Sequence, residues 1–218
     1  MSNIHSSKRT RLTISLGNNI LAMVDKTIDG VNVRNRSHAI ETLLASALDI
    51  VSIKTAIILA GGKEITKKIP AIESALDLLK KSGIFDVKIA VGFLGDKIKE
   101  NLGNGEKFGV NIEYIEGGQG TGGALLLLKN QIKSKFLVFN LREPIKCDLQ
   151  NLIKFHNEHK PYATIATKSL KENWGIYVLD PKVFTFIPKG FSMLEDEVFD
   201  KLIQEEGLLS YPILTSSE

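Results

Sequence analysis

The stretch AIILAGGKEITKKIPAI, Ala56–Ile72, joins an apolar run to a pair of glycines. Residues 56–60 are continuously apolar, which is typical of a strand buried on both faces of a parallel sheet. Gly61 and Gly62 follow directly. A glycine turn at the end of such a strand lets backbone N–H groups approach a nucleotide. The stretch therefore predicts an α/β protein with a ligand site at this strand end.

The remainder of residues 53–218 alternates between strand patterns and helix patterns. Strands are expected at 86–93, 110–115, 135–140, 162–168 and 174–179, and helices at 72–81, 97–101, from 122, and at 149–156. Alternation of this kind predicts a mostly parallel sheet with helices on both faces, and ligands bind at the carboxyl ends of its strands. The expected fold class is a Rossmann-like α/β/α domain.

Four stretches of this part resemble the sugar nucleotidyltransferase family. They are IILAGG (57–62), VGFLGDKIKENLGNGEKFGVNIEYIE (91–116), GTGGALLLL (120–128) and WGIYVLDPKVFTFIPKGFSMLEDEVFDKLIQEEGLLSYPI (174–213). The resemblance implies a nucleotidyltransferase-like domain over residues 53–218. It also implies that Gly61, Gly62 and the turn Gly120-Thr121-Gly122 hold the nucleobase and the ribose.

The segment after Gly62 departs from the family. Active members continue with Gly-Thr-Arg-Leu and later Pro-Lys, which hold the triphosphate and the metal. This chain has a shorter, lysine-rich segment, KEITKKIPA at 63–71, and KSLKEN at 168–173 stands where the family places a sugar-binding turn. Lys63, Lys67 and Lys68 either bind phosphates or form an exposed basic loop, and the sequence favours neither.

The metal ligands of the family are changed as well. The family carries a metal-binding Asp in an Asn-Gly-Asp turn, whereas this chain has Asn140-Leu141-Arg142; the second metal carboxylate aligns with Glu197. Mg²⁺ bridges phosphate oxygens during nucleotidyl transfer, and a guanidinium in place of a carboxylate opposes its binding. We therefore expect no metal site, no catalytic residues and no enzymatic activity. Arg142 then pairs either with phosphate or with Glu143.

Two other groups of side chains are weaker candidates. His156 and His159 are three residues apart in a helix pattern, but the sequence places no third metal ligand, so surface positions are favoured. LEDE, residues 194–197, is expected to be a solvated helix start rather than an acidic metal cluster. The candidate ligand-binding residues are Gly61, Gly62, Lys63, Gly120, Thr121, Gly122 and Arg142.

Residues 1–52 have a different pattern. RLTISL, Arg11–Leu16, alternates between polar and apolar residues and predicts a strand. Helix patterns follow after Gly17 and after Asn35, which is a good N-cap residue. One strand with two short helices cannot pair its own edge or cover its apolar faces, so we expect an obligate dimer.

This segment resembles the ribbon-helix-helix regulators of the Arc/MetJ type over residues 9–50. The resemblance implies that the strand face reads bases in the DNA major groove and that the second helix aims its N-terminus at a phosphate. The candidate DNA-binding residues are Arg9, Arg11, Thr13, Ser15, Asn35, Arg36 and Ser37. The alternative is a dimerisation module, or a strand–helix appendage of the larger domain, that does not contact DNA.

Composition indicates an ordinary globular protein. The chain has 218 residues, is 43% hydrophobic and has a net charge of +3, too small for a general nucleic-acid binder. It has a single cysteine, Cys147, which we expect to be structural. No apolar run reaches the ~18 residues of a membrane span, and residues 1–11 are polar. We expect a cytoplasmic protein with no membrane contact.

These expectations combine into a functional hypothesis. Residues 1–52 are the DNA-binding and dimerisation domain of a transcription regulator, and residues 53–218 have lost catalysis and sense a nucleotide or metabolite, or assemble oligomers. The expected partners are double-stranded DNA and further copies of this chain. The expected effector is a nucleotide or nucleotide sugar, with no resident cofactor. The alternatives are an active sugar-1-phosphate nucleotidyltransferase with a DNA-binding appendage, and an antitoxin-like autoregulator.

Overall fold

The computed structural model describes residues 11–30, 33–47, 53–62, 65–93, 95–144, 146–167 and 175–213. The chain divides into two compact units, Met1–Leu48 (the first unit) and Asp49–Glu218 (the second unit). Lys63 and Arg9, two of the candidate site residues, lie outside the described residues.

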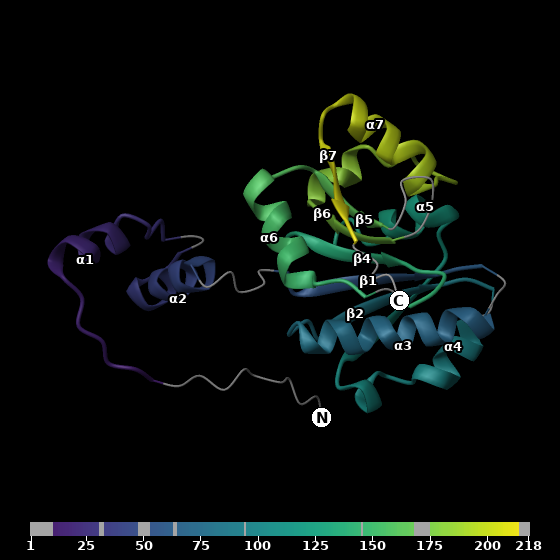
Figure 1. The fold of residues 1–218 in the computed structure, drawn as a ribbon, viewed down its shortest axis with the longest axis horizontal. Coiled ribbons are helices and arrows are strands. Elements are labelled where there is room, and N and C mark those ends of the chain that lie inside the picture. The colour runs from purple at the N-terminus through teal and green to yellow at the C-terminus, as the bar shows by residue number, and fades with distance from the viewer. Residues whose placement is uncertain are drawn as a thin grey trace. The chain divides into compact units, whose positions relative to one another are not determined.

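The second unit is built on a seven-stranded sheet with the order β3-β2-β1-β4-β6-β5-β7 (Figure 1). Its strands are β1 (Thr55–Ala60), β2 (Asp86–Val91), β3 (Asn111–Glu116), β4 (Phe136–Asn140), β5 (Ala163–Thr167), β6 (Gly175–Leu179) and β7 (Leu208–Pro212). Strands β1 to β4 pair in parallel, β6 is antiparallel to β4 and β5, and β7 is parallel to β5. The prediction of a mostly parallel, Rossmann-like α/β fold is confirmed.

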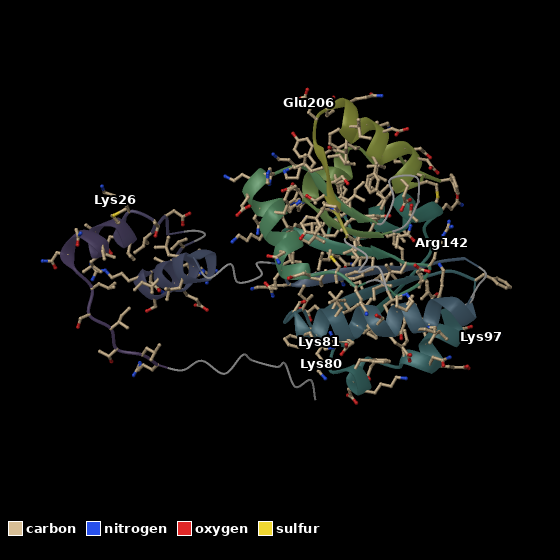
Figure 2. The ribbon with its side chains drawn as sticks, viewed as in Figure 1. Lys26, Lys80, Lys81, Lys97, Arg142 and Glu206 are labelled. Carbon is tan, nitrogen blue, oxygen red and sulfur yellow. The ribbon has the colours of Figure 1, made fainter. Side chains whose placement is uncertain are left out.

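Helices cover both faces of this sheet. They are α3 (Ile65–Lys81), α4 (Gly95–Leu102), α5 (Gly120–Leu126), α6 (Leu149–His159) and α7 (Phe199–Gln204), with 3₁₀ turns at Glu106–Phe108 and Pro181–Thr185 and a π-helix at Leu194–Val198. Figure 1 shows α3 and α4 along one side of the strands and α5 and α7 along the other. Charged side chains such as Lys80, Lys81 and Lys97 are exposed on the outer side of α3 and α4 (Figure 2).

The apolar run 56–60 is buried throughout, and its side chains alternate between the two faces. Ile58 packs in the core beneath α3, α4 and α6. Ile57 and Leu59 pack in the opposite core, with α5 and α7. Both faces of β1 are therefore dry, which explains why its sequence is continuously apolar.

The first unit contains α1 (Asn18–Asp25) and α2 (Arg36–Ala47). The predicted strand at Arg11–Leu16 is not shown, because these residues belong to no strand and only Leu16 is partly buried. A strand needs a neighbour for its backbone hydrogen bonds, and the described residues of this unit offer none. The ribbon-helix-helix arrangement is therefore not shown.

None of the helices in the described ranges has the length and apolar character needed to span a membrane.

Candidate functional site

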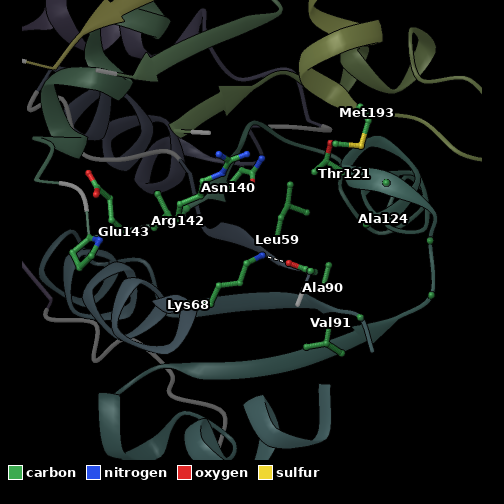
Figure 3. A pocket seen from close by; sticks show the side chains of 18 residues that line it. Leu59, Lys68, Ala90, Val91, Thr121, Ala124, Asn140, Arg142, Glu143 and Met193 are labelled. Carbon is green, nitrogen blue, oxygen red and sulfur yellow. Dashed lines mark hydrogen bonds between the residues drawn. The ribbon is translucent and has the colours of Figure 1, made fainter. Parts of the chain in front are cut away.

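A pocket of about 1080 Å³ lies at the carboxyl ends of β1, β2, β3 and β4 (Figure 3). Its lining comes from the residues that end or follow these strands: Leu59, Gly61, Gly62, Ala90, Val91, Gly92, Gly117, Gly118, Gly120, Thr121, Asn140, Leu141, Arg142, Glu143 and Pro144, with Lys68 of α3, Ala124 of α5 and Met193. This is where open parallel sheets bind their ligands.

At two positions of the pocket lining only glycine fits, because backbone atoms of other segments lie very close. Gly118 has φ +83, and a Cβ there would lie 2.6 Å from the Cα of Ala124. Gly120 has φ +77, and a Cβ there would lie 2.2 Å from the carbonyl oxygen of Ser192. Side chains other than hydrogen do not fit, so the turn after β3 presents bare backbone to the pocket.

Most of the predicted ligand-binding residues meet at this pocket. Gly61, Gly62, Gly120, Thr121 and Arg142 all line it. Gly122, another predicted ligand-binding residue, is not part of the lining. That glycine is buried, and its N–H donates a hydrogen bond of 2.9 Å to the Ser192 carbonyl.

Two cations and one acid lie on the wall of the pocket. The ammonium of Lys68 donates a hydrogen bond to the Gly61 carbonyl, which holds it at the end of β1. Arg142 follows β4 and is exposed. Glu143 is the acidic residue of the described lining, and Figure 3 shows its carboxylate at the side of the pocket remote from Thr121. The described part of the wall therefore carries two cationic side chains and one carboxylate.

Glu195 fixes the polar groups on one side of the pocket, and the sequence analysis missed this role. Its Oε2 accepts a hydrogen bond of 2.8 Å from the Thr121 hydroxyl. Its Oε1 accepts bonds of 2.7 Å from the Asn140 amide and 3.0 Å from the Tyr177 hydroxyl. Burial, and then the charge of Glu195, raises the pKa of Tyr177, so this hydroxyl keeps its proton and donates.

Glu197, aligned with a metal carboxylate of the family, lies elsewhere. It is not part of the pocket lining, and its Oε1 accepts a 3.4 Å hydrogen bond from the backbone N–H of Met193. In the π-helix Leu194–Val198 it is Glu195 that is directed toward the pocket residues. The expectation of a solvated LEDE segment is therefore wrong for Glu195.

The described lining of the pocket is poor in ligands for a magnesium ion held by the protein. The described part of the chain contains no group of three or more His, Cys, Asp or Glu side chains able to hold a metal. Mg²⁺ is usually bound through carboxylates together with substrate phosphates. Glu143 is the one carboxylate in the described lining, Arg142 is its neighbour, and both oxygens of Glu195 already accept hydrogen bonds.

The two histidines of α6 do not share a ligand. His156 is fully buried, so the favoured surface position is wrong, and its Nδ1 lies 2.9 Å from the Thr164 hydroxyl. His159 is exposed, with its Nδ1 2.9 Å from the Phe155 carbonyl oxygen. Burial raises the pKa of Cys147 to about 12, so this thiol stays protonated near neutral pH.

The candidate DNA-binding residues are not gathered on a strand face. Arg11, Thr13 and Ser15 are exposed and belong to no strand. Asn35 caps α2, since its side-chain oxygen accepts a 2.9 Å bond from the backbone N–H of His38. Ser37 is exposed in the first turn of α2. The guanidinium of Arg36 forms an ion pair with Asp25 on α1, with bonds of 2.7 and 2.8 Å.

The fold and the pocket define an α/β domain with a pocket at the carboxyl ends of its parallel strands, and residues 55–181 match the sequence model of the family described as Nucleotidyl transferase. Because this match spans more than half of the chain, the chain belongs to that family.

Named proteins and solved structures agree with this assignment. The chain is 27% identical over 193 residues to the UTP--glucose-1-phosphate uridylyltransferase of Synechocystis sp., covering 66% of this chain and 50% of that protein. It is 25% identical over 182 residues to the mannose-1-phosphate guanyltransferase of Saccharomyces cerevisiae, with the same coverage. The chain thus spans about half the length of these relatives.

HddC from Yersinia pseudotuberculosis shares the fold, with a TM-score of 0.60 at 18% identity over 73% of this chain and 90% of that chain. A second structure of HddC, complexed with GMP-PN, gives a TM-score of 0.59 at the same identity, over 74% of this chain and 91% of that chain.

These findings overturn the functional hypothesis drawn from the sequence. The expectation of a DNA-binding transcription regulator is wrong, because the family and the named relatives are nucleotidyltransferases. The expectation that the second unit has lost catalysis is overturned by the same family match and the same named relatives. The physical source of the error is the weight given to local departures, namely the short segment after Gly62, the missing sugar-binding turn and the missing Asp, since each alters a few contacts of a site with many others. The alternative of a sugar-1-phosphate nucleotidyltransferase agrees better with the findings.

Proposed function

We propose that the second unit transfers a nucleotidyl group from a nucleoside triphosphate to a sugar 1-phosphate. The observation that carries the proposal is the pocket, in which glycine turns from the ends of β1, β2 and β3 surround a space whose described wall carries two cations. The names of the relatives support the substrate class, since they include a UTP--glucose-1-phosphate uridylyltransferase and a mannose-1-phosphate guanyltransferase.

The backbone turns provide the nucleoside part of the site. Gly61 and Gly92 lie side by side there, because a Cβ on Gly92 would be 3.6 Å from the Cα of Gly61. Across the pocket, the turn 117–121 brings a second stretch of backbone and the Thr121 hydroxyl. A flat base and a ribose fit between two such backbone surfaces, whose N–H and C=O groups give hydrogen-bonding specificity.

The reaction itself requires alignment and charge neutralisation. An oxygen of the sugar 1-phosphate forms a bond to the α-phosphorus of the triphosphate. The bond from this phosphorus to the oxygen bridging to the β-phosphate breaks, and pyrophosphate leaves with the electron pair. Lys68 and Arg142 neutralise phosphate charge, and Glu195 holds the Asn140 amide and the Thr121 hydroxyl in fixed positions. Positioning and electrostatics supply most of the catalysis in such transfers.

A side chain added at Gly61 tests this proposal. A Cβ there would meet no atom within 4 Å, and its φ does not lie in the left-handed range, so Gly61→Leu fits the fold and fills space at the pocket wall. The wild type is expected to release pyrophosphate from one of the nucleoside triphosphates when a hexose 1-phosphate is added. Gly61→Leu is expected to lose this turnover with an unchanged melting temperature.

Lys97→Ala is the matched control, because Lys97 is exposed on α4 and outside the pocket lining (Figure 2). It is expected to keep wild-type turnover. Equal turnover in Gly61→Leu and the wild type would place the reaction outside this pocket and refute the proposal.

A further inference from the structure

The charges at the pocket are arranged for phosphate rather than for a metal ion. Lys68 and Arg142 enter from two different elements, α3 and the end of β4, and both are part of the lining. The carboxylates do not converge: Glu143 lies to one side (Figure 3), and both oxygens of Glu195 accept hydrogen bonds from neutral donors. The cationic groups therefore lie on the wall where a triphosphate would bind, without a matching set of carboxylates.

A bound triphosphate needs positive charge from its surroundings, and there are two ways to supply it. A divalent cation can be held between protein carboxylates and phosphate oxygens. Alternatively, Arg and Lys side chains can contact the phosphates directly, with Arg offering a planar pair of N–H donors that matches two phosphate oxygens. The described residues of this pocket provide the second set of groups.

Lys68 is already held in place for such a role. Its ammonium donates to the Gly61 carbonyl, and the residue as a whole is half-buried, so the side chain is directed to the end of β1. Arg142 is next to a buried residue, Leu141, which anchors the chain at the end of β4.

We propose that Lys68 and Arg142 neutralise the phosphates of the nucleotide directly, so that nucleotide binding does not require a divalent cation held by the protein. This inference rests on the proposed function and specifies how the same pocket binds its substrate. It also assigns a role to the arginine that occupies the metal-ligand position of the family pattern.

Calorimetric titration of the full chain with each nucleoside triphosphate, first in EDTA and then with excess Mg²⁺, tests the inference. At least one triphosphate is expected to bind in EDTA with an affinity within about threefold of that in Mg²⁺. Arg142→Ala and Lys68→Ala are each expected to weaken binding in EDTA about tenfold or more, because each removes a charge-assisted contact. Lys97→Ala is expected to bind like the wild type.

The outcomes separate the inference from the proposed function. Binding that appears only with Mg²⁺, or that is lost in Glu143→Gln but kept in Arg142→Ala, overturns the inference and leaves nucleotidyl transfer in place. Binding in EDTA that neither cation variant weakens also overturns it. Absence of binding for every triphosphate in both buffers overturns the proposed function together with the inference. Arg142 is exposed, so its variant is expected to fold.

Discussion

Acidification is expected to destabilise the second unit through His156. This side chain is fully buried at the end of α6, and its Nε2 has no hydrogen-bond partner. Burial, and then the charge of Lys135, lowers the pKa of His156 to about 4, while Asp180 acts in the opposite direction. The folded protein therefore keeps this imidazole neutral at a pH where an exposed histidine is charged.

The sign and the size of the effect follow from this difference in pKa. As the pH falls below 6.5, the unfolded chain takes up a proton at His156 before the folded chain does, so the stability present above pH 6.5 is lost on the way to about pH 4. A difference of about 2.5 units corresponds to roughly 3.4 kcal/mol at full protonation. At about pH 5 the loss of unfolding free energy from this one group is about 2 kcal/mol.

Urea unfolding from about pH 7.5 to about pH 4.5 measures this loss. His156→Gln removes the titrating group, so its unfolding free energy is expected to fall less steeply with acid than that of the wild type, by about 2 kcal/mol at about pH 5. His159→Gln is the control, because His159 is exposed on the same helix. Parallel pH profiles for the wild type and His156→Gln would refute the reasoning.

Three further outcomes are expected. Glu195→Gln removes the charge that accepts hydrogen bonds from two pocket residues and is expected to weaken nucleotide binding about tenfold in calorimetry; unchanged affinity would contradict this role. Gly120→Ala places a methyl group 2.2 Å from the Ser192 carbonyl oxygen, so the unfolding free energy in urea is expected to fall by more than about 2 kcal/mol. Gly83 has a similar φ but lies in open space, so Gly83→Ala is expected to lower the unfolding free energy by about 1 kcal/mol. Pairing of the first unit with a second copy stays a prediction, and light scattering of the wild type is expected to give the mass of a dimer. The side chain of Met23 is 68% exposed, so Met23→Lys is expected to shift the protein toward monomer. A monomeric wild type would contradict pairing.

The sheet was predictable because its signal is local. The apolar run 56–60 alone indicates a strand with two dry faces, and the structure buries each of its residues. Gly61 and Gly62 at its end placed the pocket on the correct edge of the sheet. Strand order and the antiparallel pairing of β6 were not predictable in this way, because they depend on contacts between remote segments.

Glu195 was not predictable, because its partners are remote in sequence. Thr121 is 74 residues away and Asn140 is 55 residues away. Within the acidic segment LEDE, no local pattern distinguishes the residue directed at the pocket from its neighbours. The π-helix there changes the usual helical spacing, and π-turns of this kind occur often at functional sites.

The expected strand at residues 11–16 illustrates the opposite case, in which a local pattern is insufficient. Alternation of polar and apolar residues indicates which face of a strand is dry, but it does not supply the neighbouring strand that receives the backbone hydrogen bonds. In the described part of the first unit, Leu12 and Ile14 are exposed, and Val24 and Ala39 are the buried apolar residues. The apolar side chains of residues 11–16 become buried only if another segment covers them.

Arg142 shows why a missing metal ligand is a weak argument against catalysis. The loss of function was inferred from the absent carboxylate and from a guanidinium that opposes Mg²⁺ binding, but the same guanidinium brings a positive charge to the pocket wall. Transfer at phosphorus depends on how much charge surrounds the phosphates and how well they are aligned, and both a metal ion and a guanidinium supply charge. Under the proposed function, the substitution alters the source of positive charge at the pocket, and the effects of Arg142→Ala and of Mg²⁺ on affinity measure the two sources separately.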